Sequence, residues 1–323
     1  MIISSTADIV EALRSLCAPL VGLRTLAAAP YLFRPFILVV CLGIVCALVG
    51  TLVNLRASEF HAEALVHAVF PGIVAGAVFG GIDWIIPAAG AVAVVAAALL
   101  TVVDHLARKD ASEAGTAVIL TSFFAIGIVL SLRKGDMSGQ LEALMFGRLL
   151  EVTDSRLAWA LVLCAAACVV VALSWRAQVA CAFDPIGART GGINTFAMDL
   201  VLNMAVAAVV VSAATAVGTL LVIGYIVIPG AAGRLWARTP REMVVIALAV
   251  GVGAGYCGMR LVALPTHHSL SPQATVALTM TAIFLMLAVA RRIVDRRCSR
   301  RAENGLARSE LKIAQPEVGA RVQ

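Results

Sequence analysis

Charged residues are scarce in this chain: Asp, Glu, Lys and Arg make up 14% of its 323 residues, against 61% hydrophobic residues. A water-soluble protein carries about a quarter of its residues charged, because its surface must stay solvated. The shortage excludes an ordinary soluble domain. The charges that are present crowd between long apolar runs instead of alternating along amphipathic faces, which indicates that they mark loops.

Three motifs that would assign a chemical activity are also missing. The eight cysteines form no Cys-x-x-Cys pair, so they indicate neither a zinc site nor a disulfide framework, and we assign them no role. The sequence has no Gly-x-x-x-x-Gly-Lys-Ser/Thr loop to hold nucleotide phosphates and no His-Glu-x-x-His to build a metalloprotease. We therefore expect a protein that is not an enzyme and that does not itself hold a nucleotide in such a loop.

Long apolar runs, by contrast, are abundant. A bilayer core about 30 Å thick needs roughly 20 helical residues, because every backbone polar group must be satisfied within the segment. This predicts an all-α, polytopic transmembrane helix bundle with about nine spans (eight to ten). The runs are Phe36–Leu55, Glu63–Gly80, Trp84–His105, Glu113–Leu132, Leu157–Arg176, Met198–Ala216, Val217–Leu235, Met243–Arg260 and Thr275–Ile293.

The stretch from Met198 to Leu235 is too long for one span and has no polar loop at its centre. Gly218, Gly224 and Pro229 supply its predicted break points. Because glycine and proline free backbone groups that neighbouring helices must satisfy again, a broken helix pair of this kind is expected to be buried in the bundle or to line a cavity or pathway.

Two terminal segments flank the predicted transmembrane domain, which covers residues 36–293. Within residues 1–35, apolar residues recur at helical spacing with charges between them, which predicts an amphipathic, interfacial helix. Residues 294–323 are basic and contain no aromatic residue, which predicts a disordered cytoplasmic tail. The arginines that open this tail follow an apolar run directly, a membrane-flanking pattern that argues against nucleic-acid binding.

The loop charges predict an orientation, since Arg and Lys accumulate on the cytoplasmic side. Nine spans place the N-terminus outside and the C-terminus inside. The basic residues then assigned to the cytoplasmic side are Arg56, Arg108, Lys109, Arg176, Arg189, Arg234, Arg238, Arg241 and the tail. Those assigned to the outside are Arg133, Lys134, Arg148 and Arg156.

Ionisable residues inside spans are costly, and they mark a pathway or a partner by default. Glu63 and His67 are four residues apart and so share one face of a helix. A carboxylate beside an imidazole suits manganese, zinc or iron. The alternative is a pair that simply hydrogen-bonds. His61 is a further candidate ligand.

The segment from Leu55 to Gly72 resembles the signature of the ABC-3 family, the manganese, zinc and iron permeases of ABC importers. That signature reads approximately Gly-Asp-Ala-Leu-Ser-His-Ala-Val-Leu-Pro-Gly after Leu-Arg. The matching residues are Leu55, Arg56, Ala64, Leu65, His67, Ala68, Val69, Pro71 and Gly72. Ala62 replaces the glycine and Glu63 replaces the aspartate, which keeps the charge on a longer arm.

The resemblance covers most of the chain. Further similar residues are Glu113, the run 122–127, Leu144 to Gly147, Leu150, Phe183, Asp184, Pro185, Ala188, Gly191, Val217, Gly218, Leu220, Leu221, Val222, Ile228, Pro229, Ala231, Ala232 and Arg234. One departure is the last loop, where His267 and His268 are predicted to be solvated, and we leave them out of the core site.

The resemblance implies a type II-like importer permease in the bacterial cytoplasmic membrane. Such a permease pairs with a second copy of itself, receives metal from an extracellular binding protein and is driven by a cytoplasmic ABC ATPase dimer. It holds no resident cofactor, since the metal is cargo and ATP binds the partner. Phe183, Asp184, Pro185, Ala188 and Gly191 would then belong to a short coupling helix that docks on the ATPase, whereas an ordinary capped turn would make no contact.

A competing hypothesis is an ion-coupled secondary transporter of metal or protons, because intramembrane Glu and His also serve proton relays. Such carriers are commonly built from inverted repeats, and no such repeat is evident in this sequence.

Overall fold

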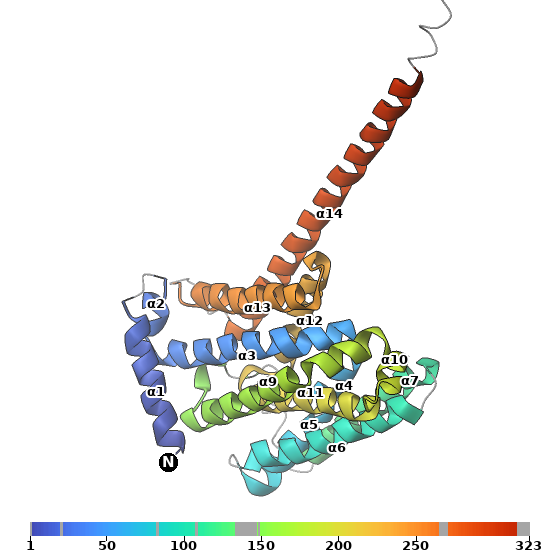
Figure 1. Cartoon of the computed structure of the whole chain (residues 1–323). Helices are drawn as coiled ribbons and strands as arrows, with labels where there is room; N and C mark the ends of the chain where they lie inside the picture. Colours follow the sequence, from blue (N-terminus) through green and yellow to red (C-terminus); the bar gives the residue numbers. More distant parts are fainter. Residues whose placement is uncertain are drawn as a thin grey trace, which may run out of the picture.

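All the regular elements in the described part of the chain are helices (Figure 1). The computed structural model describes residues 2–19, 22–81, 84–106, 109–132, 147, 149–264 and 271–314. Arg108, Arg133, Lys134, Leu144 to Phe146, Arg148, His267, His268 and the end of the tail from residue 315 lie outside the described residues.

Nine helical segments within the described residues are long and apolar enough to cross a membrane, which confirms the predicted bundle. They are α3 (Pro30–Leu55), the continuous run of α4 (Glu59–Ala68), α5 (Phe70–Ala75) and η1 (Gly76–Gly80), α6 (Ile85–Leu106), α7 (Lys109–Leu132), α9 (Asp154–Phe183), α11 (Thr195–Val217), α12 (Thr219–Trp236), α13 (Pro240–Val262) and α14 (Pro272–Ala314). Shorter elements are α1 (Ile2–Cys17), α2 (Arg24–Ala27), η3 (Leu149–Glu151) and α10 (Pro185–Thr190).

Contacts between helix ends define two ends of the bundle. At the first, which we call the α10 end, Arg234 at the end of α12 donates to the carbonyl of Asn54 at the end of α3 (3.1 Å). At the second, the α1 end, Arg34 near the start of α3 donates to Asp154 at the start of α9 (3.0 Å). Consecutive long helices therefore run in opposite directions between the α10 end and the α1 end.

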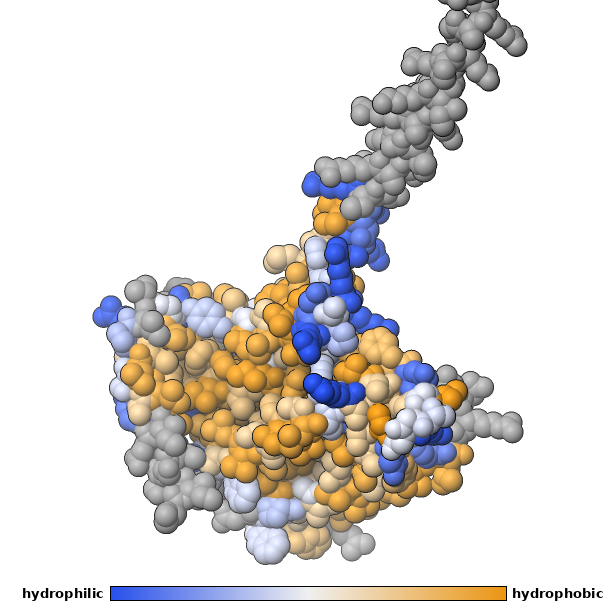
Figure 2. Space-filling model, viewed as in Figure 1, coloured by the Kyte–Doolittle hydropathy of each residue, from blue (hydrophilic) through white to orange (hydrophobic). Residues whose placement is uncertain are grey.

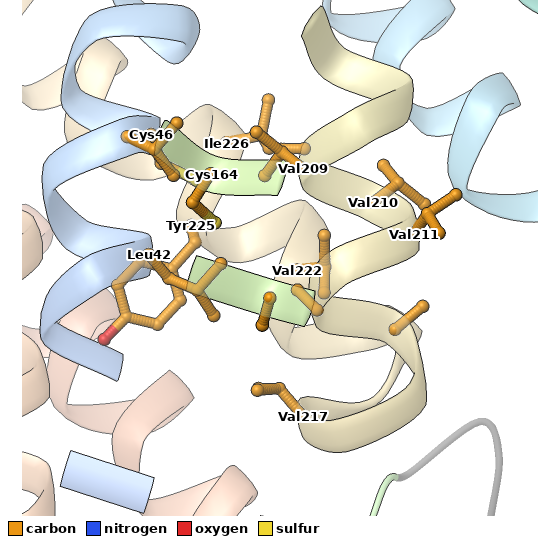
Figure 3. Close-up of a cluster of buried hydrophobic side chains, with 14 of the residues drawn as sticks. Leu42, Cys46, Cys164, Val209, Val210, Val211, Val217, Val222, Tyr225 and Ile226 are labelled. Carbon is orange, nitrogen blue, oxygen red and sulfur yellow. The ribbon is translucent and has the colours of Figure 1, made fainter. Parts of the chain in front are cut away.

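Helix α3 occupies the centre of the bundle, where it packs against α9, α11, α12 and α13. Figure 3 shows the core that forms there from buried side chains of α3, α9, α11 and α12. The labelled members are Leu42, Cys46, Cys164, Val209, Val210, Val211, Val217, Val222, Tyr225 and Ile226. Figure 2 shows hydrophobic residues over the flank of the bundle and hydrophilic ones where α14 leaves it and near α10.

One helix start and two break points differ from the sequence prediction. Helix α3 begins at Pro30, within the segment assigned to the N-terminal domain, because proline is favoured in the first turn of a helix, where no backbone N–H is needed. Gly218, with φ of +88°, separates α11 from α12 as predicted. Gly224 and Pro229 instead lie inside α12, which continues through them to Trp236. Proline removes only one backbone hydrogen bond from the helix. The packing of α12 against α3 holds the helix together across this position.

Helical structure also continues beyond the predicted end of the last span. Helix α14 runs to Ala314, through most of the segment for which we predicted disorder from residue 294. Extending an existing helix needs no new nucleus, and the segment is rich in Ala, Arg, Glu and Leu, which are strong helix formers. This part of α14 projects away from the bundle (Figure 1).

The crossing of α3 and α12 depends on Gly50. A Cβ atom at this position would lie 2.1 Å from the carbonyl oxygen of Ile226, so the two backbones touch directly. We expect Gly50→Ala to push the helices apart and to destabilise the protein by about 1–3 kcal/mol, as overpacked cores are. The measurement is the midpoint of thermal unfolding of the purified protein in detergent.

The matched control is Gly253→Ala in α13, where an added Cβ meets nothing within 4 Å. That variant should melt at or slightly above the parental temperature, because alanine favours helix more than glycine does. Equal melting temperatures for the two variants would contradict the close contact at Gly50.

Candidate functional site

Helix α4 carries the pair selected from the sequence. It follows α3 after a sharp turn in which Ala57 has a positive φ of 52°, and it ends at Ala68 shortly before Pro71 in the first turn of α5. Its core-facing residues Ala62, Ala64, Leu65, Val66 and Ala68 are buried. This apolar stripe fixes how α4 is rotated about its axis. The opposite face of the helix is left for polar side chains.

Glu63 and His67 lie on the face of α4 that is turned away from this stripe. Glu63 is exposed and His67 is half-buried. The His67 imidazole meets Phe124 of α7 edge to face, with ring centroids 5.5 Å apart. Phe124 also packs on Phe70, at 5.4 Å, so an aromatic group borders the pair on one side. The carboxylate and imidazole thus share one accessible face within a membrane span, as the four-residue spacing predicts.

His61 faces a different set of residues. Its Nε2 lies 3.3 Å from Oδ1 of Asp104 on α6 and 3.3 Å from Oγ1 of Thr116 on α7. Because it precedes Glu63 by two residues, it points about 200° away around the helix. The structure therefore does not bring His61 together with Glu63 and His67. Within the described residues, no three His, Cys, Asp or Glu side chains converge as they would around a tightly held metal.

A second polar cluster, at the α10 end, was not among the site residues predicted from the sequence. Asp199 near the start of α11 pairs through Oδ1 with Nη1 of Arg56, and its Oδ2 lies 3.8 Å from Nδ1 of His105 on α6. The His105 ring meets Phe196 edge to face, with centroids 5.0 Å apart. The signal was available, because Asp199 and His105 both fall inside runs predicted to be spans, and the rule that selected Glu63 applies to them as well.

Helix α10 is the short helix that the Phe-Asp-Pro resemblance predicts between two spans. Asp184 caps it by accepting a hydrogen bond from the backbone N–H of Gly187 (2.8 Å), and Pro185 occupies its first turn. The helix ends at Thr190, with Gly191 as its C-terminal cap. These are local sequence signals for a short, well-bounded helix.

The side chains of α10 divide between an inner and an outer face. Ala188 is buried, with 6% of its surface exposed, and fills the contact of α10 with the bundle. Ile186 of α10 and Phe183, the last residue of α9, project outward, with 76% and 68% exposed. Ala188 therefore fixes α10 to the bundle, whereas Phe183 and Ile186 form an exposed apolar surface. No sequence signal singled out Ile186.

A shallow hollow of about 390 Å³ lies beside α10. It is lined by His105, Arg189 and the run from Gly192 to Phe196. Arg189 Nε donates to Thr195 Oγ1 at 2.7 Å, which fixes α10 to the first residue of α11. The hollow and the outer face of α10 together form an irregular surface at this end of the bundle.

Comparison with known proteins places the chain in a family. The model of the ABC 3 transport family matches residues 28–291. The manganese transport system membrane protein MntC of Listeria monocytogenes is 27% identical over 256 residues, which are 79% of this chain and 89% of that protein. The chelated iron transport system membrane protein YfeC of Yersinia pestis is 29% identical over 211 residues, covering 65% and 70%.

The fold is shared with a solved structure, PsaBC from Streptococcus pneumoniae in complex with Fab. The two superpose with a TM-score of 0.71 at 23% identity, over 82% of this chain and 94% of that one. The family match covers the long helices α3 to α13, helix α10 and most of the apolar part of α14. The chain, a multi-pass membrane protein, therefore belongs to the ABC 3 transport family of transporter permeases.

Proposed function

We propose that this chain is the membrane-spanning permease of an ATP-driven importer for a divalent transition metal: manganese, iron or zinc. The carrying observation is the placement of Glu63 and His67 on one accessible face of α4 inside a membrane span. Relatives described as manganese and chelated iron transport proteins support the choice of cargo. A carboxylate oxygen and an imidazole nitrogen form a ligand set that these metals accept and that magnesium and calcium use poorly.

The assembly we propose contains two copies of this chain, a cytoplasmic ATPase dimer and an extracellular metal-binding protein. A carboxylate that faced lipid would be costly, so the face of α4 that carries Glu63 is best explained if a second copy covers it and the two faces line the pathway. The α10 end would face the cytoplasm. This orientation rests on the arginines at the α10 end, because arginine accumulates on the cytoplasmic side of a membrane protein. They include Arg56, Arg189, Arg234 and Arg238.

The proposed step at α4 predicts that transport needs the charge of Glu63 and the nitrogen of His67. Glu63→Gln keeps size and hydrogen bonding but removes the charge, and His67→Ala removes the nitrogen, so each should abolish metal uptake while the protein still assembles. Glu63→Asp, which keeps the carboxylate on a shorter arm, should retain uptake. The measurement is ATP-dependent uptake of radioactive manganese into proteoliposomes that contain the permease and its ATPase.

The charge control is Glu11→Gln, which removes a carboxylate from α1, outside the spans, and should leave uptake unchanged. Parental uptake by a folded Glu63→Gln or His67→Ala variant would overturn the proposed step. Uptake driven by a proton gradient without ATP would instead support an ion-coupled carrier.

The exposed apolar face of α10 predicts where the ATPase docks. Ile186→Asp should weaken ATPase binding roughly tenfold or more, because a charge would replace an apolar anchor in a buried contact. The measurement is the affinity of the purified permease for its ATPase, followed by size exclusion or by interferometry.

The matched control is Phe79→Asp, since Phe79 is a large apolar residue of η1 with 78% exposure. It belongs to the span that starts at the α10 end with α4, so it lies toward the opposite end of the bundle. ATPase affinity that falls equally in both variants, or in neither, would argue against docking at α10.

A further inference from the structure

Arg56 lies at the junction between α3 and α4. Its backbone N–H closes the last turn of α3 by donating to the carbonyl of Leu52 at 3.0 Å, and α4 begins at Glu59 after the tight turn at Ala57. Glu63 follows Arg56 by seven residues and lies about one helical turn into α4. A displacement of Arg56 therefore moves the start of the helix that carries Glu63 and His67.

The Arg56 side chain reaches across to two other helices. Only 10% of it is exposed, and its Nη1 pairs with Oδ1 of Asp199 on α11. Its Nη2 donates to the carbonyl of Gln178 on α9 at 3.4 Å, while Gln178 Nε2 donates to the carbonyl of Met198 at 2.9 Å. The α3–α4 junction is thus tied to the end of α9 and to the first turns of α11.

Helix α10 connects to the same turns of α11 from the other side. Arg189 of α10 donates to Thr195, and Asn194 caps α11 by accepting from the N–H of Ala197 at 3.1 Å. Thr195 and Asp199 are four residues apart and so lie on one face of α11. A continuous set of contacts therefore runs from α10 through Thr195 and Asp199 to Arg56 and the start of α4.

We propose that Arg56 and Asp199 are positioning residues that transmit the movement of α10 to α4 during transport. The argument rests on the proposed function, because it takes α10 as the ATPase-docking helix and α4 as the metal-binding one. A largely buried arginine is strongly destabilised if its partner is withdrawn, so the pair holds as the helices move. Movement at the start of α11 then shifts α4 instead of breaking the contact.

A purely structural role is the competing explanation, since an ion pair between helices can serve only to hold them together. The chain offers a matched comparison. Arg34 of α3 donates to Asp154 of α9 at 3.0 Å, so it also joins α3 to a neighbour through an Arg–Asp pair. That pair lies at the α1 end, far along α3 from α10, and belongs to no route between α10 and α4.

The experiment compares Asp199→Asn, Arg56→Gln and their double variant with Asp154→Asn and the double variant Arg34→Gln, Asp154→Asn. Each permease is assembled with its ATPase in proteoliposomes. ATP hydrolysis and manganese uptake are measured on the same samples, and the readout is manganese transported per ATP hydrolysed. Thermal stability and the amount of bound ATPase are recorded for every assembly.

We expect the ratio to fall about tenfold in Asp199→Asn and Arg56→Gln, with ATP hydrolysis and ATPase binding retained. In the double variant the ratio should fall no further, because the two residues act as one unit. The double variant also leaves no unpaired buried charge behind. The variants at the Arg34–Asp154 pair should keep the parental ratio.

Two outcomes would overturn the proposal. One is a parental ratio in the folded double variant of Arg56 and Asp199. The other is an equal fall at both pairs, which would assign them a shared structural role. Absence of ATP-driven uptake in the parental assembly would instead refute the proposed function itself.

Discussion

Close contact between helix backbones is the constraint on which the rest of this structure depends. In a bilayer the lipid tails are as apolar as the side chains, so helices associate through tight packing rather than through the hydrophobic effect. Helix α3 touches α12 at Gly50 and α13 at Gly43, where an added Cβ would lie within 3.0 Å of backbone atoms. These contacts make α3 the fixed centre of the bundle. The polar residues at both of its ends are thereby held in register with neighbouring helices.

The absence of water from the bilayer core also explains where the polar side chains gather. A buried polar group without a partner is costly in lipid, and two asparagines within the spans are paired across helices. Asn54 donates to the carbonyl of Val227 at 3.2 Å, and Asn203 donates to Thr101 at 2.9 Å. Glu63 differs from these residues because it is exposed in the single chain. That contrast within one molecule is the physical reason for proposing that Glu63 belongs to the pathway rather than to the scaffold.

Much of the fold could be predicted because span length is set by bilayer thickness, which any long apolar run must match. Helix starts were less predictable: Pro30 opens α3 through its local backbone preference, although polar and aromatic residues follow it. The site shows a similar division. The spacing of Glu63 and His67 is a local signal, whereas Arg56 and Asp199 are 143 residues apart. Their pairing depends on how α3 packs beside α11, and no local pattern reveals it.

Weak binding follows from the geometry at α4 if Glu63 and His67 bind the transported metal. A structural metal site closes four protein ligands around the ion, and it would retain cargo that must be released. The described residues of one chain offer Glu63 and His67 on this face, while His61 is turned toward Asp104 and Thr116. Two ligands from each copy, completed by water, would hold a dication long enough to select it by ligand type. A displacement of α4 relative to its counterpart in the second copy would then separate the two halves of the site, so the helix movement itself would release the metal.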